Sequence, residues 1–257
     1  MIDWLAFTAR RPLYNTYMGY WMYTHVLLNR RRKSFAKLRK LVNRENRFFL
    51  TGYPRSGNTY LTGLVRQILQ VNDFGHHLHT PLSLKIAIDK RLKTYVIFRS
   101  PMENVMSLGL LNSNQARRFV RFRWMENAYA LQKSLLLLYL REYIHYHEYV
   151  LSRSDRITLF SSDQVFSQTQ DVLRRIAIDN GLDVSQVDDE NCARARIDFL
   201  KHKGSDQNGQ LTAGVPNPQK DLAKRKLREK VEDHPLMYRA ISIFKRMEDE
   251  SLSATNL

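Results

Sequence analysis

Residues 48–60 read FFLTGYPRSGNTY, and the order of residue types in this stretch decides the fold. A short apolar run ends at Gly52 and Pro54, which indicates a buried strand that feeds into a turn. Beyond the turn, apolar residues recur at helical spacing: Leu61, Leu64, Val65, Ile68 and Leu69. The stretch therefore predicts a strand, a glycine-containing loop and a helix that begins near Gly57 or Asn58.

The loop has the outline of a phosphate-binding loop. Four residues separate Gly52 from Gly57, as in the motif G-x-x-x-x-G-K-[ST], but Asn58 replaces the lysine. Backbone N–H groups at a helix N-terminus attract phosphate, and Arg55 adds a full positive charge inside the loop. We interpret the stretch as a loop that holds a phosphate group other than that of ATP.

A second strand-to-helix junction lies in the sequence YVIFRSPMENVMSL. Arg99 ends the strand, Ser100 can cap the next helix, and Glu103 follows three residues later, as in a capping box. Ser107 lies two helical turns beyond the cap. Ligands of parallel α/β sheets bind at the carboxyl ends of strands, so Arg99 and Ser107 are expected to face the same crevice as the loop around Arg55.

The rest of the chain continues the alternation of strands and helices. A strand is predicted at 157–162, a helix at 169–182 that stops at Asn180-Gly181, and a final helix at 221–250. Residues 115–151 indicate a long helix or a helical pair, and 201–220 indicate a loop. This order predicts an α/β fold with a parallel sheet covered by helices.

Composition adds a strong positive charge to a globular chain. The 257 residues include 41 Lys and Arg against 25 Asp and Glu, a net charge of +16, which attracts phosphorylated ligands, polyanions or anionic lipid. Cys192 is the only cysteine, so an intrachain disulfide is excluded and a reducing, cytoplasmic compartment fits best. Neither a secretory signal nor an apolar stretch of the ~20 residues that span a bilayer is expected.

Residues 1–45 differ from the main domain at 46–257 because aromatic residues and methionines lie beside a basic cluster. One interpretation is an interfacial amphipathic segment, through which residues 1–40 make peripheral contact with a membrane. The other, which we favour, is a helix packed on the domain with its basic end in solvent.

At this point the sequence resembles a known family, the sulfotransferases that use 3′-phosphoadenosine 5′-phosphosulfate (PAPS). YPRSGNTYL is similar to their 5′-phosphosulfate loop, commonly Tyr-Pro-Lys-Ser-Gly-Thr-Thr-Trp-Leu, and the segment from Arg99 to Ser107 is similar to their 3′-phosphate motif. The resemblance is clear over residues 47–110. It implies a P-loop-like three-layer sandwich with a central, mainly parallel sheet flanked by helices. It also implies transfer of the sulfuryl group from PAPS to a hydroxyl or amine, with PAP as product.

The resemblance also implies roles for individual residues. The backbone of the loop would hold the 5′-phosphosulfate through Ser56, Gly57, Asn58 and Thr59. Tyr60 stands in place of a tryptophan near the adenine, and Arg55 replaces the loop lysine, with a purely electrostatic role because arginine stays charged. Arg99 and Ser107 would clasp the 3′-phosphate. Lys203 and Gly204 faintly resemble the element that closes over it.

The transfer needs a base, and a histidine cluster, GHHLHTP at residues 75–81, supplies candidates. Many family members carry the base 22 residues before the 3′-phosphate arginine, a count that leads from Arg99 to His77. His79 is a close second, because both side chains share one face of an extended stretch. The cluster has no carboxylate or cysteine at a familiar ligand spacing, so no metal is expected.

Two other functions remain open. One is an ATP-dependent phosphotransferase, against which Asn58 in place of lysine argues. The other is a non-enzymatic basic adaptor that binds a membrane or nucleic acid. The basic runs lie on separate predicted segments, which argues against binding of nucleic acid. The acceptor of a sulfotransferase would be a small molecule, a glycan or a lipid, and no motif selects among them.

Overall fold

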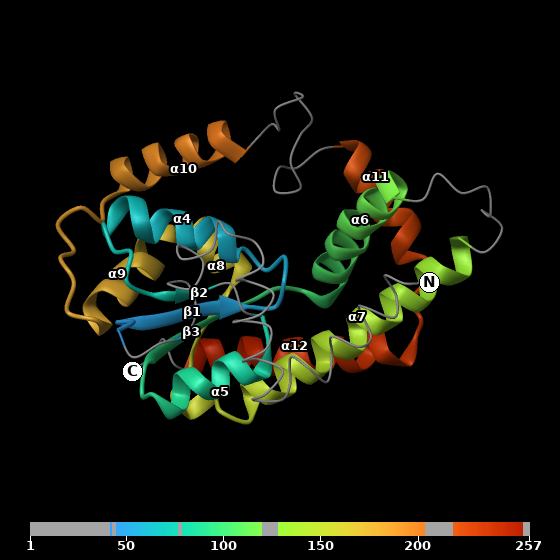
Figure 1. Cartoon of the computed structure of the whole chain (residues 1–257), viewed down its shortest axis with the longest axis horizontal. Helices are drawn as coiled ribbons and strands as arrows, with labels where there is room; N and C mark the ends of the chain where they lie inside the picture. Colours follow the sequence, from blue (N-terminus) through green and yellow to red (C-terminus); the bar gives the residue numbers. More distant parts are fainter. Residues whose placement is uncertain (1–41, 43–44, 77–78, 120–127, 204–217, 254–257) are drawn as a thin grey trace.

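The computed structural model describes residues 42, 45–76, 79–119, 128–203 and 218–253, and Figure 1 shows their arrangement. The elements follow in the order β1 (Phe48–Gly52), α4 (Asn58–Ile68), β2 (Gly75–His76), α5 (Pro81–Asp89), β3 (Lys93–Phe98), α6 (Pro101–Phe119), α7 (Ala128–Leu151), η3 (Ser154–Arg156), β4 (Thr158–Ser161), α8 (Ser162–Ser167), α9 (Thr169–Asp179), α10 (Asp189–Lys203), α11 (Pro218–Arg228) and α12 (Pro235–Ser253). None of the helices in these ranges combines the length and apolar character that crossing a bilayer requires.

The four described strands form one parallel sheet in the order β2-β1-β3-β4. Leu50 of β1 pairs with Tyr95 of β3, which pairs in turn with Thr158 of β4. Figure 1 shows α4, α9 and α10 on one side of the sheet and α5, α7 and α12 on the other. The predicted α/β three-layer sandwich with a parallel central sheet is therefore confirmed.

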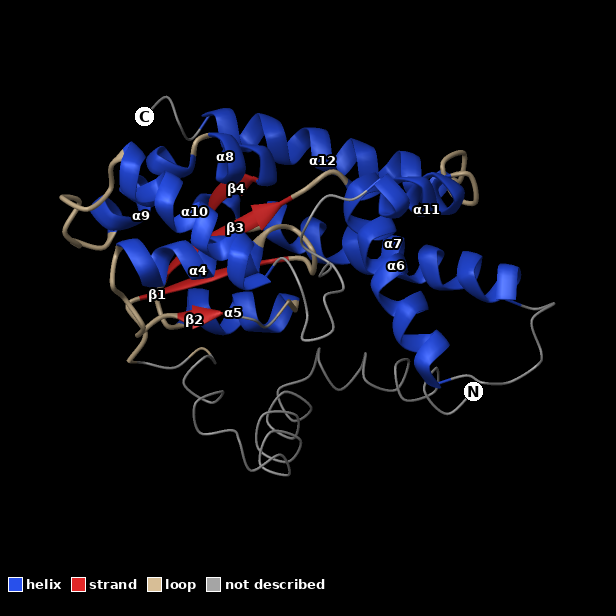
Figure 2. Cartoon of the chain, turned by 90° about the horizontal axis from the view of Figure 1, so that it is seen from above, coloured by secondary structure: helices blue, strands red, loops and turns tan. Residues whose placement is uncertain are grey.

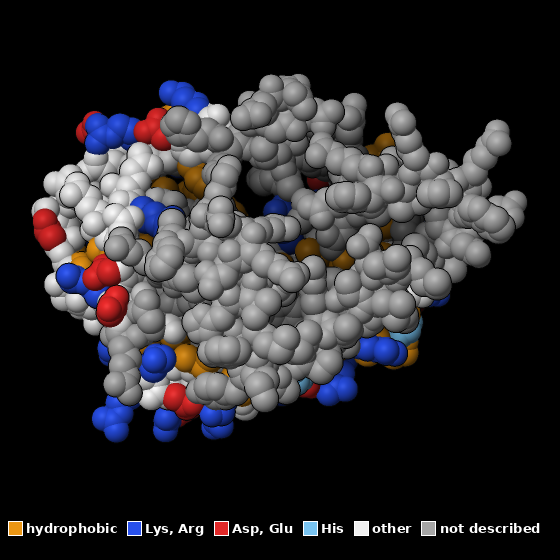
Figure 3. All heavy atoms as spheres, in the orientation of Figure 1, with side chains coloured by type: hydrophobic (Ala, Val, Ile, Leu, Met, Phe, Trp, Pro, Cys, Tyr) orange, Lys and Arg blue, Asp and Glu red, His pale blue; other side chains and the backbone are white. Residues whose placement is uncertain are grey.

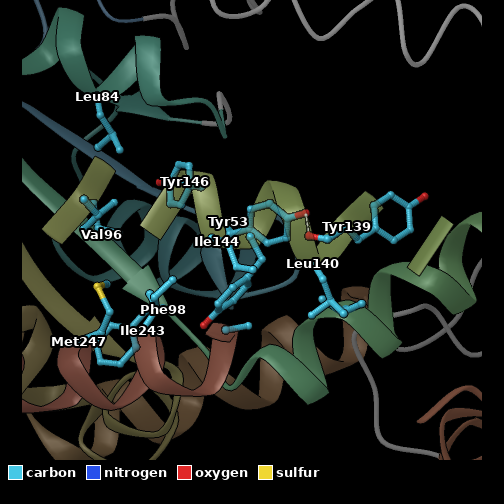
Figure 4. Close-up of a cluster of buried hydrophobic side chains, with 14 of the residues drawn as sticks. Tyr53, Leu84, Val96, Phe98, Tyr139, Leu140, Ile144, Tyr146, Ile243 and Met247 are labelled. Carbon is cyan, nitrogen blue, oxygen red and sulfur yellow. Dashed lines mark hydrogen bonds between the residues drawn. The ribbon is translucent and has the colours of Figure 1, made fainter. Parts of the chain in front are cut away.

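The sheet divides the apolar core into two parts because successive residues of a strand point to opposite faces. Phe49 and Val96 pack with α5, α7 and α12 on one face, and Figure 4 shows part of this cluster. Leu50 and Tyr95 pack with α4, α9 and α10 on the other. Burying one such side chain stabilises the fold by about 1.5–3 kcal/mol, so both helical layers are tied firmly to the strands.

The strand order reverses between β1 and β3, and this reversal positions the candidate site. From β1 the chain passes to β2 on one side, then crosses to β3 on the other. Figure 2 shows β1 and β3 side by side near the middle of the sheet. The loops that follow Gly52 and Phe98 therefore open at one edge of the sheet, where α/β proteins bind ligands.

Several boundaries differ from the sequence-based expectations. The expected helix at 221–250 is two helices, α11 and α12, because residues 229–234 form turns and Pro235 starts a new helix. The expected loop at 201–220 is shorter, since α10 continues to Lys203 and α11 begins at Pro218. The helix that was predicted to stop at Asn180-Gly181 does so, with Gly181 at a φ of 61°.

Two segments bear on the remaining predictions. The stretch predicted as one helix or a pair at 115–151 belongs to α6 and α7, with 120–127 outside the described residues. The segment 1–45 also lies outside them, except for residues 42 and 45. Val42 is buried in the core on the α5 side of the sheet.

Candidate functional site

The loop between β1 and α4 makes a tight turn at the carboxyl end of β1. The Ser56 N–H donates to the Tyr53 carbonyl at 3.2 Å, and Arg55 adopts a left-handed φ of 75°. Gly57, with a φ of 105°, is the N-cap of α4 and has no side chain to cap the helix. The first-turn N–H groups of α4 are therefore left facing the loop, with the positive end of the helix dipole behind them.

Asn58, the residue in place of the phosphate-loop lysine, has a structural role. Its Nδ2 donates to the carbonyls of Gly52, at 3.1 Å, and of Tyr53, at 3.2 Å, and the side chain is buried. Gly52 permits close packing at this point, because a Cβ there would lie 2.2 Å from the Ile97 carbonyl oxygen. The asparagine closes the loop from inside, so only its backbone N–H can face a ligand.

Arg55, Ser107 and Arg99 come together from the two strand-to-helix junctions. The Arg55 Nε donates to the Ser107 Oγ at 3.0 Å, although 52 residues separate them. The Arg99 Nη1 donates to the Arg55 carbonyl at 3.3 Å. The loop after β1 and the helix after β3 thus build one group of polar side chains around the N-terminus of α4.

The electrostatics of this group favour an anion. The pKa of Arg55 is lowered, first by burial and then by the positive charge of Arg99. Glu103 contacts Arg99 at 3.3 Å and Lys224 of α11 at 3.0 Å, so its carboxylate forms ion pairs at the position predicted for a capping box. Near the centre of the face that Figure 3 presents, blue Lys and Arg side chains are visible among the described atoms, with a red acidic side chain close by. A phosphate or sulfate would reduce the repulsion between the two guanidinium groups.

Asn104 is a residue of the site that sequence reasoning missed. Its Nδ2 donates to the Ser56 Oγ at 2.9 Å, and both side chains are completely buried. The Ser56 hydroxyl is thus engaged within the protein, while Thr59 is exposed. The available signal was position, because Asn104 lies one helical turn before Ser107 and a polar residue there faces the same side.

The histidine cluster is only partly described. His77 lies outside the described residues, and His79 is half-buried with its Nδ1 at 2.6 Å from the Gly52 carbonyl. A carbonyl can only accept, so Nδ1 carries the proton and Nε2 is the basic nitrogen of the neutral ring. Burial lowers the pKa of His79, and the bond to Gly52 raises it by less. His79 therefore presents a neutral imidazole beside the phosphate loop at neutral pH.

His76 has a different environment. It lies on β2, and its Nε2 is 2.6 Å from the Nη2 of Arg66 on α4. An arginine can only donate, so this nitrogen is an acceptor already in use. Among the residues that the structure describes, no three His, Cys, Asp or Glu side chains are placed to hold a metal ion.

The aromatic residues near the loop are arranged differently from the sequence-based expectation. Tyr60, expected near an adenine, is buried against Phe166 and Phe199, with ring centroids 4.8 and 5.2 Å away. Phe166 of α8 is 40% exposed, and its ring lies 3.6 Å from the position of a Cβ on Gly57. Among the described residues, Phe166 therefore offers an exposed aromatic ring beside the loop, and no periodicity in the sequence could have singled it out.

The closing element that was predicted near the C-terminal loop is mostly outside the described residues. Lys203 is the last residue of α10, and nothing of its side chain is described. Gly204 lies outside the described residues.

His147 of α7 lies under the loop and has an unusual environment. It is completely buried among Tyr53, Tyr143 and Tyr146, and its Nδ1 donates to the Tyr143 carbonyl at 2.8 Å. Its Nε2 is buried without a hydrogen-bond partner in the described part of the chain. Burial lowers the pKa of His147 to about 4, although the bond to Tyr143 opposes this shift. The ring is therefore neutral when the protein is folded.

This burial predicts a loss of stability in mild acid. Between pH 6.5 and 4 the unfolded chain binds a proton that the folded His147 does not, so the free energy of unfolding falls as the pH falls. The full loss is up to about 3 kcal/mol. Urea unfolding of the wild type and of His147→Leu at pH 7.5, 6 and 5 measures it. The variant should show a flatter dependence on pH, and parallel curves would contradict the assignment.

The chain was compared with protein-family models, curated proteins and solved structures, and only the solved structures gave a match. No family model matches the chain, and no curated protein matches it. Among solved structures, the chain is similar to mouse sulfotransferase SULT7A1 complexed with PAP, with 15% sequence identity and a TM-score of 0.50. The match covers 85% of this chain and 94% of the mouse chain. At this identity the similarity establishes that the two chains share the α/β fold.

Proposed function

We propose that the protein transfers a sulfuryl group from PAPS to a hydroxyl or amine acceptor. The observation that carries the proposal is the contact of Arg55 with both Ser107 and Arg99, made at the uncapped N-terminus of α4. PAPS carries one phosphate group at the 3′ position of its ribose and another at the 5′ position. A protein that binds it therefore needs two neighbouring sites for anions. The shared fold with a PAP-bound sulfotransferase supports the same proposal.

The residues present fit such a donor. The N–H groups of Gly57, Asn58 and Thr59 would hold the 5′-phosphosulfate beside Ser56, whose own N–H already donates to the Tyr53 carbonyl. Arg99 and Ser107 would bind the 3′-phosphate. The Ser107 hydroxyl accepts from Arg55 and still has its own hydrogen to donate. Phe166, rather than Tyr60, offers an exposed ring on which the adenine could stack. Lys203 and Gly204 are proposed to complete the 3′-phosphate site.

In the transfer step, the acceptor oxygen or nitrogen bonds to the sulfur as the bond from sulfur to the phosphate oxygen breaks. A histidine takes the proton of the acceptor, and PAP leaves with the negative charge. We assign the base to His79, because its Nε2 is the basic nitrogen and Gly52 fixes its ring next to the loop. His77 is the alternative. Arg55 and the α4 N–H groups would stabilise the charge that develops on the leaving phosphate.

The acceptor that receives the sulfuryl group belongs to one of three chemical classes. A small molecule, a glycan or a lipid would each suit the basic surface, and the last would fit contact of residues 1–40 with a membrane. A panel of acceptors incubated with sulfur-labelled PAPS identifies the class directly.

Binding of the donor tests the proposal. Adenosine 3′,5′-bisphosphate should raise the melting temperature without Mg²⁺, and Arg99→Ala should weaken its binding 10- to 100-fold by removing a charged phosphate donor. Arg47→Ala is the matched control, since Arg47 forms an exposed ion pair with Asp73 at the other end of β1. Stabilisation of the protein by Mg-ATP alone would instead indicate a phosphotransferase.

A further inference from the structure

Helix α7 holds both halves of the candidate site through tyrosine hydroxyls. The Tyr53 hydroxyl, on the first residue after β1, donates to the Tyr139 carbonyl at 3.1 Å. The Tyr143 hydroxyl donates to the carbonyl of Arg99, the first residue after β3, at 2.8 Å. One helix thus bonds to both chain segments that carry the site arginines, Arg55 and Arg99. No residue of this helix belongs to the two sequence motifs that predicted the site.

The two bonds belong to one packed unit. Tyr139 and Tyr143 are four residues apart, so they lie on the same face of α7. The rings of Tyr53 and Tyr143 meet edge to face, with centroids 5.6 Å apart. Figure 4 shows Tyr53 between the sheet and α7, with its hydrogen bond to Tyr139 drawn. A shift of either segment would disturb the other through this contact.

The Tyr143 bond is strong because its surroundings are apolar. The side chain is completely buried, and burial followed by the negative charge of Glu248 raises its pKa well above the ordinary value. The hydroxyl therefore stays protonated and remains a donor. A hydrogen bond in such a medium resists displacement, because the Arg99 carbonyl would lose its partner without gaining water.

We propose that Tyr143 is a positioning residue for donor binding, which fixes the backbone of Arg99 so that its guanidinium reaches the phosphate site. This inference rests on the proposed function. The Arg99 side chain extends from a backbone that has two kinds of constraint: the ladders of β3 with β1 and β4 before it, and the Tyr143 hydroxyl on its own carbonyl. Without the second constraint, the strand end and the guanidinium can move away from Arg55.

The test compares two completely buried tyrosines, only one of which bonds to Arg99. Tyr143→Phe removes the hydroxyl and keeps the ring, and binding of adenosine 3′,5′-bisphosphate at 20 °C should weaken 5- to 20-fold. Tyr95→Phe is the control, because Tyr95 is also completely buried on β3 but its hydroxyl does not bond to Arg99. It bonds instead to Asp179 and Asn180 at the end of α9. Both variants should melt at a lower temperature, but Tyr95→Phe should bind the nucleotide as the wild type does.

A double-mutant cycle separates positioning from general stability. If Tyr143 acts through Arg99, Tyr143→Phe should not weaken binding further in the Arg99→Ala background, although it should still lower the melting temperature. Equal binding by Tyr143→Phe and the wild type, or full additivity with Arg99→Ala, overturns the inference while leaving the proposed function intact. A wild type that does not bind the nucleotide overturns both. Should Tyr143→Phe not fold, Tyr53→Phe removes the matching tether, and normal binding by that variant overturns the shared role of α7.

Discussion

Replacing Arg55 by alanine should lower kcat by 10²- to 10³-fold, a loss of the size seen when one preorganised donor to a developing charge is removed. The structure gives the reason, because Arg55 is held by Ser107 at the N-terminus of α4. The guanidinium is thereby held beside the first-turn N–H groups of α4, where its charge can face an anion without first reorganising. The assay is transfer of label from PAPS to the best acceptor of the panel, at saturating donor.

Arg55→Lys is the matched control for this prediction. Both variants keep the left-handed backbone at residue 55, which costs alanine and lysine about as much as arginine, and only lysine keeps the charge. The lysine variant should recover most of the rate. Alanine also removes the repulsion from Arg99, so its melting temperature should change little. An alanine variant with the kcat of the wild type would show that the loop binds without assisting the reaction.

The central part of the fold could be predicted because local signals and the tertiary structure agree there. FFLTG is apolar and is followed by a turn and a periodic helix, and it forms β1, the loop and α4. TYVIF gives β3 for the same reason. Once two parallel strands with helices after them are established, their carboxyl ends must share an edge. Arg55, Arg99 and Ser107 therefore come together as the junctions require.

Other features depend on contacts that no local pattern contains. β2 has only two residues, and it exists because Gly75 and His76 pair with β1. Tyr60 follows the loop directly, yet it lies on the buried face of α4. Phe166, which lies beside the loop, belongs to α8, a helix much later in the chain. Asn58 was recognised as a replacement, but its bonds to Gly52 and Tyr53 depend on the closed loop. Tertiary packing decides each of these.

His79→Asn should lower kcat 10²- to 10⁴-fold, the range expected when a general base is removed. Asparagine is a suitable replacement, because its amide can still donate to the Gly52 carbonyl and hold the loop in place. Donor binding should therefore be unchanged, which separates loss of the base from loss of structure. His77→Asn is the control, and it should keep most of the activity. The reverse result, with His77 essential and His79 dispensable, would move the base two residues along the chain.

The dependence of kcat on pH supplies a second and independent test of His79. A base works only when neutral, and burial lowers the pKa of this imidazole below its ordinary value of about 6.5. The wild-type rate should consequently stay constant from neutral pH down past 6.5 and fall only below it. Because the folded state itself loses stability there through His147, the rate must be measured at a temperature where the protein remains folded at each pH. A rate that already falls above pH 7 would require a base whose pKa is raised, and a histidine buried beside Gly52 does not have that property.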